Sequence, residues 1–510
     1  MVLHGSALLS PECDLRPAQK QEFFFEEQVV QSPAGNLGHA QLPQVSVIER
    51  IQSILAPLDV TDEMLKNLMT SMNDTFDRGL QSNEPGASTL KMLPSYVCAL
   101  PNGTEDGNFL ALDLGGTNFR VLMITLREND RHADMSSKIY RIPNSLMIGS
   151  GQQLFDHIAS CLAQFIRDHG LTGKRLPLGF TFSFPCAQHG LTSATLINWT
   201  KGFKCSDVEG QDVVQLLRRA VKRRQDVDID VVALLNDTVG TLMALAHEDP
   251  YCHVGVIVGT GTNACYLERI NRCKKLDGDP NFKGSLDEGE MIINTEWGAF
   301  GDNGELDVCR TEFDHVVDKN SINPGRQIFE KMISGMYMGE LVRVILEKLT
   351  MDGLLFDGTG SDELYTKGKF PTKFVSEIES DLLSAERTFT NTMNILDDLD
   401  IEHATQADCA NVAYICSRVS TRAAYLCATG IATILNRMEK DRVTVGVDGS
   451  MYRFHPTFKR LLNEKIKQLL TFPCRYTLKL SEDGSGRGAA LVAAVATRLQ
   501  EEEQAKMDDS

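Results

Sequence analysis

The sequence predicts an α/β fold that is divided into at least two lobes, and three observations support this prediction. The chain has 510 residues, which is more than a single hydrophobic core accommodates. Apolar, strand-like runs alternate with helical segments along residues 108–235, as they do in α/β proteins. Three apolar strands, at 109–126, 253–267 and 442–454, each run into a glycine turn. One such turn is weak evidence of phosphate binding, but three of them suggest two lobes that enclose a phosphate chain.

The first turn lies in FLALDLGGTNFRVLMITL, residues 109–126, which reads as a strand, a tight turn and a second strand. Gly115 and Gly116 carry no side chain and permit positive φ, so the N–H groups of the turn can surround a phosphate. Asp113 precedes the turn, where a carboxylate can hold Mg²⁺ directly or through water. Arg120 follows it, where it can meet a phosphate oxygen. Taken alone, the stretch is explained equally well as an ordinary hairpin.

The other elements follow from apolar spacing and from helix and turn signals. Helical spacing over 45–80, with Thr61 ahead of two acids, predicts two helices. Gly86 and Pro94 are expected to bracket a loop that leads to the first hairpin. Beyond it we expect helices at 153–169, 211–224 and 238–247, strands at 176–184 and 231–235, a strand-rich block at 254–300, a largely helical segment at 322–440, a strand at 443–447 and a helix at 485–499.

Composition narrows the class of protein. The net charge of −18 argues against a nucleic-acid partner. No apolar run reaches the roughly 18 residues that a membrane span needs, and the first residues show no secretory signal. The 13 cysteines are scattered, with no C-x-x-C pair, which indicates neither a disulfide framework nor a zinc site. A reducing, cytoplasmic compartment is therefore expected.

A candidate catalytic group lies in LLNDT, where Asp237 follows a buried strand and precedes a helix. Sites in α/β proteins usually lie at that edge of the sheet. A carboxylate there can accept a proton from a substrate hydroxyl, as the base does in phosphoryl transfer. The alternative is that Asp237 only caps the following helix, which is the commoner role for a residue in that place. The neighbouring Asn236 strengthens the catalytic interpretation relative to the capping one.

Two loops combine amides, hydroxyls and charges in a way that suits a polyol. NWTKGF at 198–203 offers an amide, a hydroxyl and a cation, and NTEWGAF at 294–300 places an acid beside glycine and aromatic residues. The hydroxyls of a polyol need paired donors and acceptors. Each loop is also explained as a packed aromatic turn with exposed charges. The sequence contains no Walker A motif and no protein-kinase motif set, so any use of ATP relies on other groups.

Taken together, these segments resemble the eukaryotic hexokinase family, as a single hexokinase unit related to glucokinase. The resemblance covers about residues 45–500 in the family's order, and it is specific as a combination rather than by any one motif. The segments that carry it are LALDLGGTNFRV, LGFTFSFPC, LINWTKGFK, LLNDTVGTL, IVGTGTNACY, NTEWGAFGD, NPGRQIFEKMISGMYMGE, STRAA, VGVDGS and EDGSGRGAA.

The resemblance implies an actin-like, ribonuclease H-like ATPase fold, with two lobes hinged over a central cleft. It implies a helical segment packing with the large lobe at 43–100, a small lobe at 101–235 joined by a helix at 483–500, a large lobe at 236–482 and a tail at 501–510. The mixed, aperiodic composition of residues 1–42 predicts a disordered extension there. Asp237 is the implied general base, Lys201 the catalytic cation, and Asp113 the residue nearest to Mg²⁺, with a water expected between them. The implied sugar ligands are Ser183, Thr200, Lys201, Asn236, Asp237, Asn263, Glu296 and Glu330. The implied ATP ligands are Asp113, Gly115, Gly116, Thr117, Asn118, Arg120, Thr260, Gly261, Gly335, Met336, Thr366, Asp448, Gly449 and Ser450.

The implied activity is phosphorylation of the 6-hydroxyl of glucose, and also of fructose and mannose, with ATP and Mg²⁺. The cytoplasm is the expected location, and association with the outer mitochondrial membrane is not supported, because the first residues do not resemble the apolar mitochondrial leader of some hexokinases. A monomer is favoured. Two alternatives stay open: a sugar sensor without catalytic activity, and an actin-like ATPase without a sugar substrate. The intact Asp237 and Lys201 argue against the sensor, and the polar residues of 198–201 and Glu296 argue against the ATPase.

Overall fold

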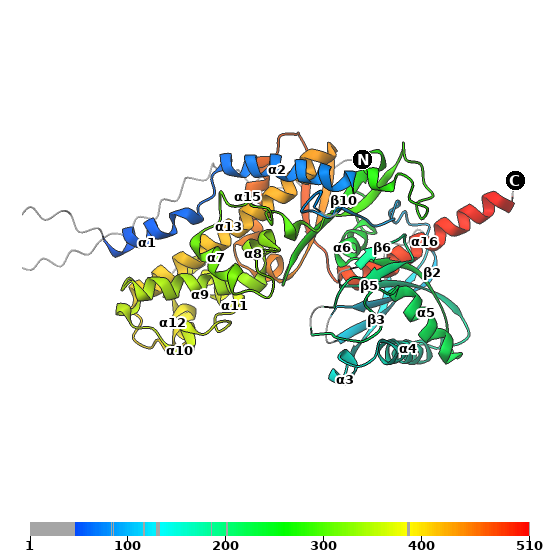
Figure 1. The fold of residues 1–510 in the computed structure, drawn as a ribbon, viewed down its shortest axis with the longest axis horizontal. Helices are drawn as coiled ribbons and strands as arrows, with labels where there is room; N and C mark the ends of the chain where they lie inside the picture. Colours follow the sequence, from blue (N-terminus) through cyan, green and yellow to red (C-terminus); the bar gives the residue numbers. More distant parts are fainter. Residues whose placement is uncertain are drawn as a thin grey trace, which may run out of the picture. The chain divides into compact units, whose positions relative to one another are not determined.

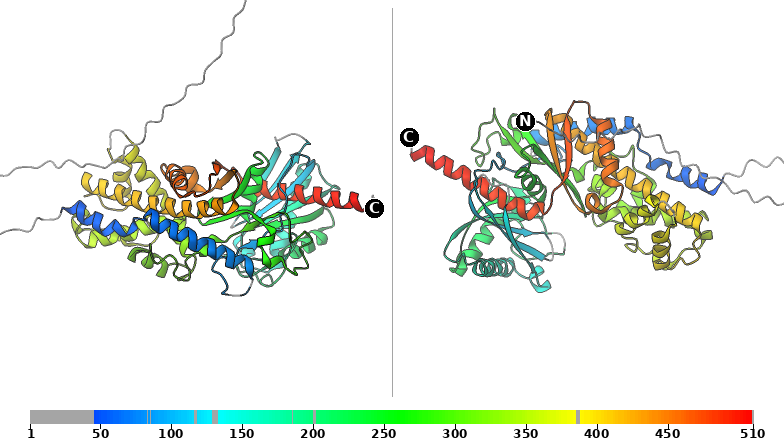
Figure 2. Two further views of the ribbon diagram at one scale, coloured as in Figure 1. Left: turned by 90° about the horizontal axis from the view of Figure 1, so that it is seen from above. Right: turned by 180° about the vertical axis from the view of Figure 1, so that it is seen from behind.

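Two mixed β-sheets and the helices around them form the framework of the chain (Figures 1 and 2). They lie in one compact unit that begins at Ser46. The predicted extension at 1–42 falls outside the described residues. The computed structural model describes residues 46–82, 84, 86–115, 118–128, 133–184, 186–199, 202–384 and 388–508.

The first sheet has five strands in the order β4-β3-β2-β5-β8. The hairpin predicted at 109–126 is confirmed as the antiparallel pair β2–β3, in which Asp113 lies opposite Arg120. The strands β2, β5 and β8 are parallel. Their carboxyl ends therefore meet at one edge of the sheet. The strands are β2 (Gly107–Leu114), β3 (Asn118–Leu126), β4 (Asp134–Arg141), β5 (Arg175–Phe182) and β8 (Asp228–Leu235).

Helices cover both faces of this sheet, as the side chains of β2 show. Leu110 and Leu112 belong to the core formed with α4 (Gly151–Asp168) and α5 (Val213–Arg224), whereas Ala111 belongs to the core that contains α16. This two-residue alternation is that of a strand buried on both faces. The helix α16 (Gly484–Asp508, red in Figure 1) packs on β2, β3, β5 and β8.

The second sheet has six strands in the order β1-β11-β10-β9-β12-β13. Pro94 was expected to bound a loop, but it lies in β1, at the edge of this sheet. An edge strand tolerates proline because one side of the strand needs no ladder hydrogen bond. The parallel pair β9–β12 places Asp448 opposite Ile257. The strands are β1 (Leu93–Pro94), β9 (Cys252–Val258), β10 (Thr262–Arg269), β11 (Glu290–Asn294), β12 (Arg442–Asp448) and β13 (Arg475–Leu480).

The largely helical segment predicted at 322–440 is confirmed, and Thr61 caps α2 by accepting a hydrogen bond from the Met64 N–H at 3.2 Å. α6 packs on both β9 and α16. The helices not yet given are α1 (Val47–Leu55), α2 (Asp62–Gln81), α3 (Asn144–Met147), α6 (Asp237–Ala246), α7 (Glu312–Lys319), α8 (Ile328–Ile333), α9 (Gly335–Met351), α10 (Asp362–Tyr365), α11 (Thr372–Leu383), α12 (Thr390–Asp398), α13 (Gln406–Met438), α14 (Ser450–Phe454) and α15 (Phe458–Leu469), with a two-stranded ribbon β6 (Cys186–Gln188) and β7 (Ala194–Leu196).

Candidate active site

A cluster of two amides and a carboxylate lies where β10 and β11 run side by side. The Asn263 amide donates to Asn294 Oδ1 at 2.8 Å and to Glu296 Oε1 at 3.2 Å. The Asn294 amide donates to the same Glu296 oxygen at 2.9 Å. Glu296 has a left-handed backbone, with φ of 55°, a conformation that costs of order 1 kcal/mol or more and is typical of functional sites. Sequence reasoning named Asn263 and Glu296 but missed Asn294, although it belongs to the same NTEWGAF loop.

Glu330 meets the turn between β9 and β10 from the short helix α8. Its Oε2 accepts a hydrogen bond from the Thr262 N–H at 3.0 Å. A Cβ atom on Gly261 would lie 2.5 Å from that oxygen. The glycine therefore leaves room for the carboxylate at the turn.

Asn236, and not Asp237, is the N-cap of α6. Its Oδ1 accepts a hydrogen bond from the Thr238 N–H at 2.9 Å. Asp237 is the first residue of the helix, where the partial positive charge of the helix N-terminus favours a carboxylate. The capping role that competed with a chemical role for Asp237 therefore belongs to its neighbour.

Two neighbouring carboxylates act on Glu330 at this site. Burial raises the pKa of Glu330, and the negative charges of Glu296 and Asp237 raise it further. The hydrogen bond from the Thr262 N–H and the positive charge of Lys331 act in the opposite direction. Closely spaced carboxylates and amides, some of them buried, can accept and orient the hydroxyl groups of a polyol.

The turns predicted to bind phosphate after β9 and β12 lie against each other. Gly449 has φ of 115°, and a Cβ atom on it would lie 2.3 Å from the Val258 carbonyl oxygen. The start of α9 joins the same place, because the Gly335 N–H donates to the Gly259 carbonyl at 2.8 Å. The backbone here has the close approach and positive φ that a phosphate-binding turn uses. The structure thus brings together Thr260, Gly261, Gly335, Met336, Asp448, Gly449 and Ser450.

The β2–β3 hairpin carries a second charged group. Arg120 forms ion pairs with Asp483 and, at 3.6 Å, with Asp113. The Ser485 hydroxyl donates to Asp113 Oδ2 at 2.7 Å. Ser183 lies beside the turn, since its N–H donates to the Leu114 carbonyl at 3.1 Å. Sequence reasoning missed Asp483 and Ser485; their signal was the glycine-rich EDGSGRG at the start of a helix, to which no role was given.

Several predicted ligands do not join these groups in the structure. Thr366 is exposed, and its hydroxyl donates to the Asp362 carbonyl of its own segment at 2.8 Å. Asn118 begins β3 as an exposed residue. Gly115, by contrast, does lie beside the hairpin group, because a Cβ atom on it would be 3.6 Å from Ser183 Oγ. The predicted ligands Gly116, Thr117, Thr200 and Lys201 lie outside the described residues.

Within the described residues, no helix combines the length and apolar character needed to cross a membrane. The cysteines of the same residues are free thiols.

Known proteins share both the sequence and the fold of this chain. Two family models, each described as hexokinase, match residues 50–247 and 253–495. Human hexokinase HKDC1 is 47% identical over 499 residues, which are 97% of this chain and 52% of the relative. Human hexokinase-2 is 49% identical over 457 residues, 88% of this chain and 48% of the relative. The chain thus spans about half the length of the curated relatives it matches.

The structural comparison agrees with the sequence. A hexokinase from Schistosoma mansoni, solved in complex with glucose, superposes with a TM-score of 0.79 at 45% identity, covering 88% of this chain and 99% of that one. A second hexokinase crystal structure gives a TM-score of 0.78 at 32% identity over the same shares. The actin-like α/β fold predicted from the resemblance is confirmed. The chain belongs to the hexokinase family.

Proposed function

We propose that this chain transfers the γ-phosphoryl group of ATP to the 6-hydroxyl of glucose, and also of fructose and mannose. The observation that carries the proposal is the polar cluster of Asn263, Asn294 and Glu296. The negative charges of Glu296 and Asp237 also act on the neighbouring carboxylate of Glu330, whose pKa they raise. Such a set of acceptors and donors suits the hydroxyls of a hexose. The glucose in the related Schistosoma hexokinase structure supports the same substrate class.

Asp237 is the proposed general base for the 6-hydroxyl. Its place at the start of α6, capped by Asn236, fixes the backbone that carries the carboxylate. A positioned carboxylate that accepts the hydroxyl proton as the phosphorus–oxygen bond forms supplies general-base catalysis. Arg120 and Lys201 are the proposed cations near the phosphates, and Ser183, Thr200 and Lys201 complete the sugar ligands. Phosphoryl transfer depends mainly on positioning and charge neutralisation, which these residues provide.

The residues around the glycine turns fit a nucleotide. Gly261 and Gly449 stand where a side chain would clash, so both turns keep the close backbone approach that a phosphate-binding turn uses. Asp113, held by Ser485, is the proposed residue beside Mg²⁺, to which a water would bridge it. When bound with ATP, Mg²⁺ neutralises phosphate charge. Asn118, Met336, Thr366 and Ser450 complete the proposed ATP ligands.

The organisation and location of the protein follow from the same family. We propose the two lobes at 101–235 with 483–500 and at 236–482, hinged so that a sugar is enclosed between them. A monomer in the cytoplasm is the proposed state, and the free thiols agree with a reducing compartment.

A coupled assay with ATP, Mg²⁺ and a panel of hexoses tests the proposal. We expect ADP to form in step with sugar 6-phosphate, and only when a sugar with a free 6-hydroxyl is present. A sensor would bind glucose in calorimetry without any turnover. An actin-like ATPase would release ADP at the same rate whether or not a hexose was added. Either result would overturn the proposed activity.

A further inference from the structure

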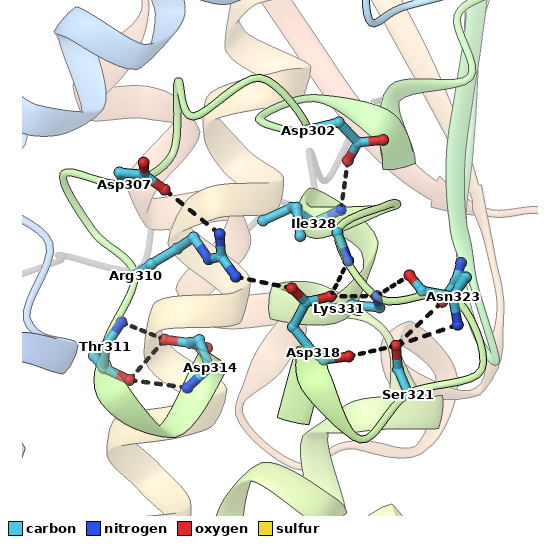
Figure 3. Close-up of polar contacts among 11 residues, drawn as sticks. Asp302, Asp307, Arg310, Thr311, Asp314, Asp318, Ser321, Asn323, Ile328 and Lys331 are labelled. Carbon is cyan, nitrogen blue, oxygen red and sulfur yellow. Dashed lines mark hydrogen bonds and ion pairs between the residues drawn. The ribbon is translucent and has the colours of Figure 1, made fainter. Parts of the chain in front are cut away.

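The helix that carries Glu330 depends on its surroundings for its position. α8 has only six residues, too few for a stable isolated helix, and its N-cap Gln327 has a left-handed backbone with no side-chain cap. The Ile328 N–H instead donates to Asp302 Oδ1 at 3.0 Å, so a residue of the preceding loop fixes the first turn (Figure 3). The exact place of the Glu330 carboxylate is therefore set by contacts that α8 makes with other segments.

Lys331, the residue after Glu330, makes two of these contacts. It is almost completely buried, with 5% of its surface exposed. Its ammonium donates to Asp318 Oδ1 at 2.6 Å and to the Asn323 carbonyl at 2.8 Å (Figure 3). A buried ammonium is tolerated only when it is paired and hydrogen-bonded, so these partners hold Lys331 in one place.

Asp318 links this lysine to two further segments. It lies on α7 and pairs with Arg310 at 3.2 Å (Figure 3). It also accepts a hydrogen bond from the Gly325 N–H at 2.9 Å. Burial alone would raise the pKa of Asp318, but hydrogen bonds from Lys331 and Gly325 and the charge of Arg310 hold it below its ordinary value. The carboxylate is therefore an ionised anchor to which α7, the segment before α8 and α8 itself are all attached.

Lys331 is also the cation next in sequence to Glu330, and its charge acts on the Glu330 carboxylate. Its charge opposes the effect of burial, Glu296 and Asp237 on the pKa of Glu330. Both its contacts and its charge therefore connect Lys331 with Glu330. The Lys331–Asp318 ion pair begins at the residue next in sequence to Glu330, whose carboxylate contacts the β9–β10 turn.

We propose that Lys331, anchored by Asp318, is a positioning residue that fixes α8 and so keeps the Glu330 carboxylate on the β9–β10 turn, where it meets a hexose hydroxyl. This inference rests on the proposed function, since it takes Glu330 as a sugar ligand. Lys331 acts through Glu330, so its loss affects glucose binding more than the chemical step or the binding of ATP.

The test compares Lys331→Met, Glu330→Gln and the double variant with wild type. Glucose affinity is measured by calorimetry without nucleotide, and kcat and both KM values by the coupled assay. We expect Lys331→Met to weaken glucose binding about 10-fold or more, with kcat and the KM for ATP changed less than about 3-fold. In the double variant the loss should be close to that of Glu330→Gln alone, because both changes remove one interaction.

Lys465→Met is the matched control. Lys465 is also buried, with 7% of its surface exposed, and it pairs with Asp62 at 2.7 Å. It joins α15 to α2, which hold none of the proposed ligands. This variant should lose thermal stability as Lys331→Met does, yet bind glucose as wild type does. If the two lysine variants behaved alike toward glucose, the positioning role would be overturned.

The remaining outcomes also decide. Suppose that wild type phosphorylates glucose but Lys331→Met binds glucose normally, or that the losses of affinity add in the double variant. Either result would overturn the inference and leave the proposed function standing. Wild type that neither binds nor phosphorylates glucose would overturn both. If Lys331→Met does not fold, Asp318→Asn takes its place: a 10-fold loss of glucose affinity, roughly, is expected, and unchanged affinity would refute the anchor.

Discussion

The Ser485 hydroxyl donates a 2.7 Å hydrogen bond to Asp113, across a sequence separation of 372 residues. The contact ties the first turn of α16 to the hairpin on which the proposed phosphate turn lies. It also gives the carboxylate a fixed orientation, because Arg120 meets the same group from the opposite strand at 3.6 Å. Ser485, which was not among the ligands predicted from sequence, therefore orients Asp113, which was predicted to lie beside Mg²⁺.

Ser485→Ala is predicted to weaken the use of ATP. A hydrogen bond to a charged group contributes about 1.5–3 kcal/mol, so the KM for Mg·ATP should rise by roughly 10-fold or more, with the KM for glucose unchanged. Steady-state kinetics with each substrate varied in turn measure both values. Thr497→Ala is the control, since that hydroxyl on the same helix donates only to the Ala493 carbonyl at 2.9 Å. A folded Ser485→Ala variant with normal KM for ATP would contradict the prediction.

Asp237→Asn is predicted to lower kcat by at least about 100-fold, the lower range for loss of a general base. The amide keeps the shape of the side chain but cannot take up the hydroxyl proton. Calorimetry should show that glucose still binds. Asp212→Asn, a change to the N-cap aspartate of α5, should leave kcat unaltered. Near-normal turnover in the Asp237 variant would remove this residue from the mechanism.

Glu330→Gln is predicted to stabilise the fold while it weakens glucose binding. Burial raises the pKa of Glu330 above its ordinary value of 4.5, so the ionised carboxylate costs stability at pH above the folded-state pKa, and the cost vanishes below the unfolded-state pKa. Glutamine has no charge and can still accept the hydrogen bond from the Thr262 N–H.

The thermal midpoint of Glu330→Gln should therefore exceed that of wild type at pH 7, and the difference should shrink as the pH falls toward about 4.5. Circular dichroism melts between these pH values measure it. A difference that did not change with pH would show that the charge of Glu330 has no such cost.

Gly488→Ala is predicted to destabilise the protein. A Cβ atom there would lie 2.0 Å from the Gly240 carbonyl oxygen on α6, and neither backbone can move aside easily. Overpacking of this kind costs about 1–3 kcal/mol. Because α6 begins at Asp237, a loss of kcat should accompany the lower thermal midpoint. Gln500→Ala, on the exposed part of the same helix, is the control and should melt as wild type does. Equal stability of the two variants would refute the close packing.

The parts of the fold and site that could be predicted from sequence are those with a local cause. The β2–β3 and β9–β10 hairpins follow from apolar strands broken by glycine turns, and both are confirmed. Glu296 was proposed because it lies in the polar NTEWGAF loop, whereas Asn263 was proposed from the family resemblance. Asn236 could be placed at a helix start, although the assignment of the cap to Asn236 instead of Asp237 needed coordinates.

The parts that could not be predicted depend on contacts between distant segments. The pairing of Arg120 with Asp483 and the anchoring of Lys331 by Asp318 join residues that share no periodic pattern. Pro94 was misplaced because its neighbour in the sheet, β11, lies about 200 positions away and gives no local signal. The roles of all the proposed site residues, Thr200 and Lys201 among them, stay predictions.

The position of α16 in the chain has a consequence for synthesis. This helix packs on β2, β3, β5 and β8, and it is the last element of the described chain to leave the ribosome. Until residues 484–496 emerge, one apolar face of the five-stranded sheet, including Ala111, Leu122 and Ala233, has no cover. Nascent chains that present such a face are prone to aggregate and to engage chaperones. Ribosome-bound chains arrested before Gly484 should therefore stay sensitive to protease across residues 107–235, and those arrested after α16 has emerged should become resistant there.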